Sequence, residues 1–299
     1  MDVVRAFILG SLVEVAVPKP GNVSRLRDFE DLTFYHFLFA NTALIGPYIE
    51  AVKRGILLKE GKIKPNEVGI GELIKTAVSN SKKYQDANPN FGVVTLSVPL
   101  IVAISSGASI EDAGKVATNL IFNSTPLDSV EFYKAIRIAN PKGIPKGVKY
   151  DVYSDSSFKE LIEDDINLWR LAEISCPREL IFCEWLHSYE ITYETLEMLE
   201  RLCGSLELEE CIRKTFLELL ARYEDTLILR KAGKEEAKLV KEMARKVLHG
   251  TLKIEYFERF MSERGDLRNP GSLADIMAVA LSLLFCKGYY LRGLFLKKL

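Results

Sequence analysis

The sequence lacks the features that mark several common classes of protein. Its 299 residues include 40 Lys and Arg against 41 Asp and Glu, so no net positive charge is available to hold a nucleic acid backbone. The longest apolar stretch, 276–286, is too short to span a bilayer. The first apolar run is interrupted by Arg5 and Glu14 and has neither the basic region nor the cleavage site of a signal peptide. We therefore expect a soluble, cytoplasmic protein that binds neither nucleic acid nor membrane.

Cysteine is sparse, and its spacing excludes the usual zinc sites. The five cysteines contain no CxxC pair and no neighbouring histidine pattern; they are Cys176, Cys183, Cys203, Cys211 and Cys286. In a cytoplasmic protein such cysteines are expected to be reduced and buried. Glutamine occurs once, at Gln85, whereas 27% of the residues are charged, and this balance favours a thermophilic source.

The sequence also lacks the short motifs of several common enzyme sites. It contains no G-x-x-x-x-G-K-[ST], G-x-G-x-x-G, H-E-x-x-H or G-x-S-x-G segment. An ordinary P-loop kinase, Rossmann enzyme, zincin or α/β-hydrolase is therefore disfavoured. The histidines His36, His187 and His249 are isolated on expected helices, where structural roles are the simpler interpretation.

Apolar residues recur at helical spacing through most of the chain, and strand-like alternation is scarce. Ile70, Leu73 and Ile74, for example, would share one face of a helix over 70–84. Further helices are expected over 2–17, 31–54, 93–106, 110–122, 126–139, 157–172, 176–189, 192–203, 207–222, 234–248, 251–262 and 272–294. With 48% hydrophobic residues, a chain of this length can bury one core, so we predict an all-α fold with a single compact multi-helix domain over 1–299.

Four loops interrupt this helical pattern and gather Pro, Gly, Asn and Asp. They cover 18–30, 86–92, 140–155 and 265–271. Loops held by a rigid helical scaffold are where polar binding groups commonly lie. We therefore expect a polar site formed by these inter-helix loops.

The first loop follows Glu14 and contains PKPGNV at 18–23. Its two prolines fix the backbone around Lys19, while Gly21 and Asn22 allow the tight turn that a phosphate contact often needs. Lys19 would then face an anion. A helix stop followed by a solvated turn fits the same pattern at least as well.

The second loop, NPNFG at 88–92, leads into an apolar helix. Asn90 can hydrogen-bond a sugar or phosphate, and Gly92 lets the backbone approach closely. The same residue types are ordinary turn formers, so this segment alone is weak evidence.

The segment DSVEFYKAIR at 128–137 places Asp128, Tyr133 and Arg137 on one helix. Asp128 could ligate magnesium and Arg137 could reach a phosphate. A capping box between Thr125 and Asp128 is the structural alternative. Downstream, the YDV segment at 150–152 adds one further acid, Asp151.

Two later segments also combine polar groups with helix starts. In EDTLILRKAG at 224–233, Asp225 and Thr226 precede an apolar turn that Arg230 closes, which suits a metal and phosphate site as well as surface ion pairing. NPGSLADI at 269–276 opens a helix whose free N–H groups favour anions. It supplies Asn269, Gly271 and Asp275.

Taken in order, these motifs resemble the series found in the triphosphoribosyl-dephospho-CoA synthase family. They are PKPGNV, NPNFG, D-x(4)-Y-x-A-I-R, YDV, D-T-x(3)-R and NPG-x-x-AD, and they span residues 14–275. The resemblance implies a helical, cytoplasmic transferase. It would move the 5-triphosphoribosyl group of ATP to the 2′-hydroxyl of dephospho-CoA and release adenine.

The resemblance also implies roles for the residues in these motifs. Mg²⁺ would be held by Asp128, Asp225 and Asp275, and Glu14 or Asp151 would activate the acceptor hydroxyl. Phosphates would meet Lys19, Arg137 and Arg230. The other expected nucleotide contacts are Gly21, Asn22, Asn90, Gly92, Tyr133, Thr226, Asn269 and Gly271.

Two positions depart from the family's pattern, and other functions stay open. Asn88, Pro89 and Asn90 stand where Asn-Thr-Asn is common, and Glu179 stands where an Asp-x-Ile pattern is common. The expected partners are ATP and dephospho-CoA or a related hydroxyl acceptor, and a homo-oligomer is left open. One alternative is a related ribosyl or phosphoribosyl transferase in another coenzyme pathway, for example that of a pterin. Another is a helical nucleotide-binding regulatory module without turnover.

Overall fold

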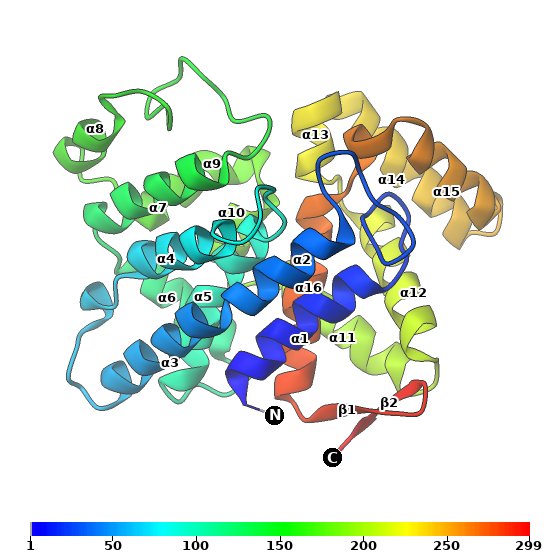
Figure 1. Cartoon of the computed structure of the whole chain (residues 1–299), viewed down its shortest axis with the longest axis horizontal. Coiled ribbons are helices and arrows are strands. Elements are labelled where there is room, and N and C mark those ends of the chain that lie inside the picture. The colour runs from blue at the N-terminus through cyan, green and yellow to red at the C-terminus, as the bar shows by residue number, and fades with distance from the viewer. Residues whose placement is uncertain (1) are drawn as a thin grey trace.

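The apolar helix α16 (Gly271–Cys286) lies at the centre of the molecule, which a computed structural model describes over residues 2–299 (Figure 1). Its residues from Ile276 to Phe285 are all buried. Helices α1 (Val3–Ala16), α5 (Phe91–Ser105) and α11 (Glu190–Cys203) pack against it. Gly10 of α1 permits a close approach, since a Cβ there would lie 2.2 Å from the hydroxyl oxygen of Ser282. The core is therefore built around one helix that neighbours surround.

Two groups of helices flank this centre in Figure 1. The first group contains α2 (Phe34–Ala43), α3 (Ile45–Lys59), α4 (Ile70–Lys82), α6 (Ala113–Phe122), α7 (Pro126–Ala139), α8 (Ser157–Glu163), α9 (Leu168–Ser175) and α10 (Leu180–Leu186). The second contains α12 (Leu208–Arg222), α13 (Thr226–Ala232), α14 (Lys234–Leu248) and α15 (Ile254–Glu263). Three short 3-10 helices are η1 (Pro65–Glu67), η2 (Cys176–Arg178) and η3 (Gly265–Arg268). The predicted all-α class is confirmed.

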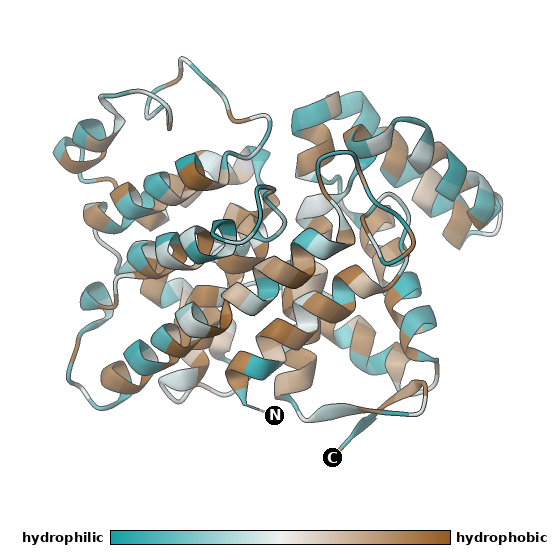
Figure 2. Cartoon of the chain, viewed as in Figure 1, coloured by the Kyte–Doolittle hydropathy of each residue, from teal (hydrophilic) through white to brown (hydrophobic). Residues whose placement is uncertain are grey.

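The hydropathy of each helix follows its position. In Figure 2, α15 at the edge of the molecule alternates between teal and brown residues. Only Phe257 and Met261 are buried in that helix. Helix α5 is the opposite case, because its residues from Gly92 to Ala103 are all buried. None of the helices within residues 2–299 is long and apolar enough to cross a membrane.

Several predicted helix limits differ from the structure. The expected helix over 31–54 is divided at Leu44 into α2 and α3. The one over 157–172 breaks into α8 and α9 because Asp165 adopts a left-handed conformation with φ 51°. A seven-residue helix, α13, lies in a segment for which no helix was predicted. Its length is too short to produce a clear periodic signal.

The end of the chain also departs from the expected helix over 272–294. Helix α16 stops at Cys286, and Gly288 follows with φ 90°, which helical backbone cannot accommodate. The chain then forms an antiparallel hairpin of β1 (Tyr289–Arg292) and β2 (Phe295–Lys298). This is the only sheet in the described part of the chain.

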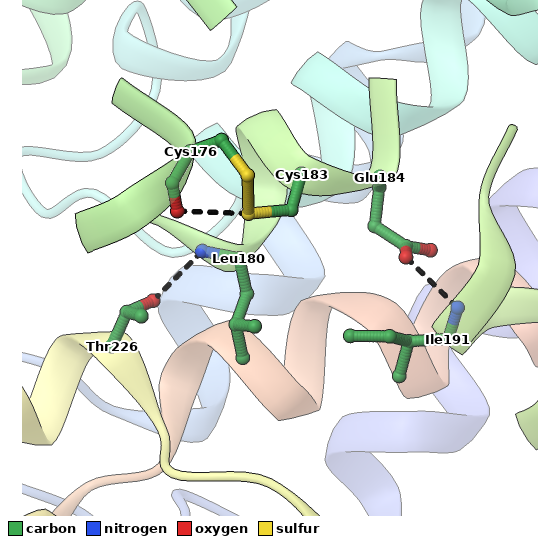
Figure 3. Close-up of a disulfide and its surroundings, with 6 residues drawn as sticks. All are labelled: Cys176, Leu180, Cys183, Glu184, Ile191 and Thr226. Carbon is green, nitrogen blue, oxygen red and sulfur yellow. Dashed lines mark hydrogen bonds between the residues drawn. A yellow bond between two sulfur atoms is a disulfide. The ribbon is translucent and has the colours of Figure 1, made fainter. Parts of the chain in front are cut away.

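The expectation of reduced cysteines is wrong for four of the five. Cys176 is joined to Cys183 by a disulfide, shown in Figure 3, and Cys203 is joined to Cys211. Each pair is seven or eight residues apart and joins neighbouring helical segments, which sequence spacing alone did not reveal. Cys286 is a free cysteine.

Candidate active site

A cavity of about 1270 Å³ lies where the four predicted loops meet. Its wall includes residues from all four loops and from the segments that follow α9 and precede α14. Figure 1 shows two of these loops, coloured blue and green, beside α13 at one end of the molecule. The sequence therefore located the walls of the cavity from the positions of its Gly, Pro, Asn and Asp residues.

Two carboxylates from helix ends line the cavity. Glu14 lies in the last turn of α1, and Asp275 lies in the second turn of α16. Gly92 faces Asp275 so closely that a Cβ at Gly92 would come within 2.0 Å of the Asp275 Oδ2 atom. A side chain at position 92 would therefore displace this carboxylate.

The surroundings of Asp275 disfavour its charged form. Burial raises the pKa of Asp275 well above its usual range, and the nearby negative charges of Glu14 and Asp225 raise it further. Arg230 and the backbone N–H of Val93 act in the opposite direction. Asp275 is accessible from the cavity, although it lies deep in the molecule. A cation bound beside it would favour the carboxylate.

Lys19 lies behind this wall and does not face the cavity. Its Nζ atom is 3.0 Å from Oε1 of Glu14 and donates to the carbonyl of Val17 at 3.0 Å. The side chain is fully buried. Burial raises the pKa of Glu14, and the charge of Lys19 partly offsets that rise. Lys19 therefore balances a buried acid where the sequence suggested a phosphate contact.

The PKPGNV turn brings its last polar residue to the cavity. Gly21 has φ 82°, and a Cβ there would lie 2.7 Å from the carbonyl oxygen of Arg268. This close approach places Asn22 beside Asn269, whose Oδ1 accepts from Asn22 Nδ2 at 3.0 Å. Asn22 Oδ1 is buried without a hydrogen-bond partner among residues 2–299. Asn22 lines the cavity, so water, a cation or a ligand donor is the expected partner of this unpartnered oxygen.

Asn90 also carries unpartnered atoms but does not line this cavity. It precedes the first residue of α5 and is 2% exposed. Neither its side-chain oxygen nor its nitrogen has a hydrogen-bond partner in the part of the chain that the structure describes. Gly92, two residues later, does reach the wall.

Basic residues line another part of the wall. The Nη1 atom of Arg230 pairs with Glu179, and both side chains are mostly buried. Lys231 donates to Oδ2 of Asp266 at 3.1 Å, and Lys142 lies 3.1 Å from the same oxygen. Further cations on the wall are Lys82, Lys149 and Arg178. This part of the cavity therefore suits an anionic ligand.

The Arg230 guanidinium is only partly satisfied by its acid partner. Its Nε atom is buried and makes no hydrogen bond to any described residue. Burial raises the pKa of Glu179 to about 7, although the positive charge of Arg230 lowers it. Arg230 therefore lines the cavity with one edge of its guanidinium held by Glu179, while its Nε atom is buried and unpartnered.

Tyr133 lines the cavity, whereas Arg137 does not. The Tyr133 hydroxyl donates to the carbonyl of Tyr150 at 2.8 Å. Arg137 donates from Nε to the carbonyl of Val152 and from Nη2 to that of Ser154, both at 2.7 Å. Arg137 is thus committed to holding the 150–157 loop, and the structure does not bring it to the expected phosphate position.

Asp151 stabilises the same loop. Its Oδ2 accepts from the Gly147 N–H at 2.7 Å, and its Oδ1 accepts from the Tyr153 N–H at 2.9 Å. These bonds lower the pKa of Asp151. The carboxylate lies outside the cavity wall, so its geometry fits a loop-stabilising role better than the predicted activation of an acceptor.

Two of the three predicted metal ligands are helix caps. Asp128 completes the capping box with Thr125, and its Oδ1 accepts from the Gly71 N–H at 2.9 Å, which ties α7 to α4. Asp225 accepts from Leu227 N–H through Oδ1 and from Leu273 N–H through Oδ2, both at 2.8 Å. Neither carboxylate lines the cavity. Both accept hydrogen bonds from N–H groups at helix N-termini instead.

Thr226 has a similar supporting position. Its hydroxyl donates to Oγ of Ser272 at 2.9 Å and accepts from the Leu180 N–H at 3.3 Å. It therefore joins the starts of α10, α13 and α16 without lining the cavity. The residues that meet at the wall, among those predicted, are Glu14, Asn22, Gly92, Tyr133, Arg230, Asn269, Gly271 and Asp275.

Sequence reasoning missed several wall residues. Lys142 and Lys149 lie in the predicted loop over 140–155, and Lys231 directly follows Arg230. The sequence predicted that these loops form one site, but not which of their charged side chains would meet. Asp266 illustrates this, because it contacts both Lys142 and Lys231.

Among residues 2–299, no group of three or more His, Cys, Asp or Glu residues is arranged to hold a metal on its own. The fold and the cavity together define an all-helical protein with a large pocket that carries oxygen donors and cations, as an enzyme acting on a charged nucleotide requires.

The family assignment agrees with this class. The profile of the ATP:dephospho-CoA triphosphoribosyl transferase family, CitG, matches residues 1–292. The chain belongs to this family and is a triphosphoribosyl transferase that acts on ATP and dephospho-CoA. The family resemblance predicted from the motif series is confirmed.

One solved structure from Archaeoglobus fulgidus, provisionally named a triphosphoribosyl-dephospho-CoA synthase, has the same fold. It is 24% identical to this chain, and the match covers 86% of this chain and 100% of that chain with a TM-score of 0.67. No curated protein sequence matches.

Proposed function

We propose that the cavity binds ATP and dephospho-CoA together and catalyses substitution at the ribose C1′ of ATP. The bond between C1′ and adenine N9 breaks, and a bond forms between C1′ and the 2′-oxygen of dephospho-CoA. Adenine takes up a proton as it leaves, and the acceptor hydroxyl loses one. The observation that carries this proposal is the convergence of the Arg230 guanidinium and the Glu14 and Asp275 carboxylates on one large cavity.

The triphosphate is assigned to the basic part of the wall. Arg230, Lys231 and Lys142 all lie on this wall. Lys231 pairs with Asp266, and Lys142 pairs with both Asp266 and Asp31. A phosphate can take the place of these carboxylates as the partner of the lysines. Charged hydrogen bonds of this kind are stronger than neutral ones, which supports placing the polyphosphate here.

The acceptor hydroxyl is assigned to Glu14. Glu14 lines the cavity, whereas Asp151, the other predicted base, lies outside it. Its Oε1 atom faces Lys19 across a 3.0 Å ion pair. Since burial raises its pKa, Glu14 is a better proton acceptor than a solvated carboxylate. The expected role is to orient the hydroxyl and take its proton.

Mg²⁺ is assigned to Asp275 and to the unpartnered Oδ1 of Asn22. Oxygen donors suit this ion, which usually takes one or two protein ligands and completes its shell with water and phosphate. The donor set around Asp275 fits, because a cation there would offset the clustered negative charges that raise its pKa. Bound Mg²⁺ would supply charge neutralisation for the triphosphate.

The cytoplasm is the compartment that this proposal implies. The substrates, ATP and dephospho-CoA, are supplied inside the cell. The two disulfides do not contradict this placement, since intracellular proteins of hyperthermophiles are often rich in disulfides.

A panel of acceptors tests the proposed reaction. The protein would be incubated with ATP and Mg²⁺ and with dephospho-CoA, CoA, a hydroxylated pterin or no acceptor, and free adenine would be quantified. We expect adenine only with dephospho-CoA. Adenine with the pterin alone would favour the related transferase, and ATP binding without adenine from any acceptor would favour a regulatory module.

A further inference from the structure

The Cys176–Cys183 disulfide closes a short segment that contributes to the cavity wall. Cys176 begins η2 directly after α9, and Cys183 lies within α10 (Figure 3). The segment between the two cysteines supplies Arg178, Glu179 and Phe182 to the wall. The disulfide is therefore only a few residues from the acid that pairs with Arg230.

Glu179 stands at the junction of η2 and α10, where its N–H donates to the Cys176 carbonyl and its own carbonyl accepts from the Phe182 N–H. This residue is extended, with φ −142° and ψ 103°, and no side chain caps the following helix α10. The N–H of the next residue, Leu180, donates to the Thr226 hydroxyl at 3.3 Å, as Figure 3 shows. Thr226 in turn donates to Ser272 of α16. The disulfide and these hydrogen bonds thus both restrain the backbone around Glu179.

Glu179 fixes one edge of the Arg230 guanidinium. Its carboxylate pairs with Nη1, while Nε is left without a partner among the residues described. An arginine side chain loses much rotamer freedom when it is fixed, so an arginine that is already oriented binds a phosphate at lower entropic cost. The position of Glu179 therefore bears on how well Arg230 can bind.

We propose that the Cys176–Cys183 disulfide is a positioning element for nucleotide binding, which holds Glu179 so that the Arg230 guanidinium on the cavity wall is oriented for the triphosphate. This inference rests on the proposed function. A small-molecule dithiol can reduce this disulfide. One of its thiolates attacks a cysteine sulfur and breaks the S–S bond, so that Cys176 and Cys183 become thiols while the dithiol is oxidised to its cyclic disulfide. We expect this reduction to weaken ATP binding at the cavity.

The second disulfide provides a matched control. Cys203 and Cys211 are eight residues apart, against seven for the first pair, and neither lines the cavity. We would compare the wild-type protein with the C176S/C183S and C203S/C211S variants. The readouts are the KM for ATP, kcat and the melting temperature, all with saturating Mg²⁺ and dephospho-CoA.

The C176S/C183S variant should raise the KM for ATP about tenfold with kcat within about twofold of wild type. C203S/C211S should lower the melting temperature without raising that KM. An unchanged KM in C176S/C183S, or an equal rise in both variants, would overturn the inference. If wild type binds no ATP, the proposed function fails as well, so the two failures are distinguishable.

A double-variant experiment separates positioning from general loosening. Glu179→Ala should raise the KM for ATP, and adding C176S/C183S to it should produce little further change, because both act through the same contact. If the increases in the KM for ATP caused by Glu179→Ala and by C176S/C183S multiply in the combined variant, the disulfide does not act through Glu179. If C176S/C183S does not fold, wild type treated with dithiothreitol replaces it. Mass spectrometry would identify the reduced pair, and reoxidation should restore the original KM.

Discussion

Gly92 and Asp275 occupy the same small space at the cavity wall, because a Cβ at position 92 would lie 2.0 Å from Asp275 Oδ2. Glycine at the start of α5 is thus what lets this carboxylate sit against the helix N-terminus, where the Val93 N–H reaches it. Gly92, noted in the sequence as a turn former, therefore makes room for Asp275, which is more than 180 residues away in the chain.

Gly92→Ala should displace Asp275 and reduce turnover at least tenfold, while the fold survives. Gly46→Ala is the control, since Gly46 is also helical but a Cβ there meets nothing within 4 Å. Alanine in a helix is about 0.5–1 kcal/mol more favourable than glycine, so Gly46→Ala should keep its activity and melt no lower than wild type. Full activity in Gly92→Ala would show that the Asp275 position is unimportant.

Asp225→Ala should destabilise the fold, in contrast to the small effect expected for a surface metal ligand. The carboxylate accepts from the N–H groups of Leu227, Ile228 and Leu273, and its loss leaves buried donors at the starts of two helices. We expect a loss of about 2–4 kcal/mol in the free energy of unfolding. Urea denaturation measures it, with exposed Lys238→Ala as the control. A stable but inactive variant would restore the metal-ligand hypothesis.

Arg230→Ala should weaken binding of ATP with Mg²⁺ by about 10- to 100-fold, the range expected when a charge-assisted hydrogen bond is lost. Isothermal titration calorimetry would give the dissociation constants. Arg170→Ala is the matched control, because Arg170 forms an exposed ion pair with Glu173 outside the cavity wall. Equal affinities for wild type and Arg230→Ala would remove Arg230 from the phosphate site.

Stability should fall as pH rises from about 5 to 7. Burial raises the pKa values of Glu179 and Glu184 to about 7 and that of Asp225 to about 6. In this window the folded chain holds more protons than the unfolded chain, so the free energy of unfolding decreases with increasing pH. Acids with lowered pKa values, such as Asp266, change the free energy of unfolding mainly below pH 5.

Chemical denaturation at several pH values would measure this slope in the ligand-free protein. Glu179→Gln removes one of the titrating groups and should flatten the curve, whereas Glu255→Gln, on the surface of α15, should not. A wild-type stability that increases steadily between pH 5 and 7 would contradict the assignment of protonated buried acids.

The sequence predicted the helical class and the walls of the site better than the roles of individual residues. Helical spacing depends on local burial, and turn residues mark loops wherever they occur, so both could be read along the chain. Whether Asp128 or Asp225 caps a helix or faces a ligand depends on which N–H groups lie beside it, and a capping box and a metal motif have the same residues.

Long-range pairing was hidden for the same reason. Glu179 was noted only as a departure from the family pattern, yet it is the partner of Arg230, 51 residues away. Lys142 and Asp266 are 124 residues apart and meet at the cavity. No periodicity or motif spacing encodes such contacts. The pairing of the cysteines in the two disulfides could not be predicted for the same reason.

The most direct test of the central claim is simultaneous measurement of both products from ATP, Mg²⁺ and dephospho-CoA by liquid chromatography and mass spectrometry. The account predicts free adenine and triphosphoribosyl-dephospho-CoA in a one-to-one ratio, with both lost in the Arg230→Ala variant at ATP concentrations near the wild-type KM. ADP or AMP as the main product, with no adenine, would contradict it.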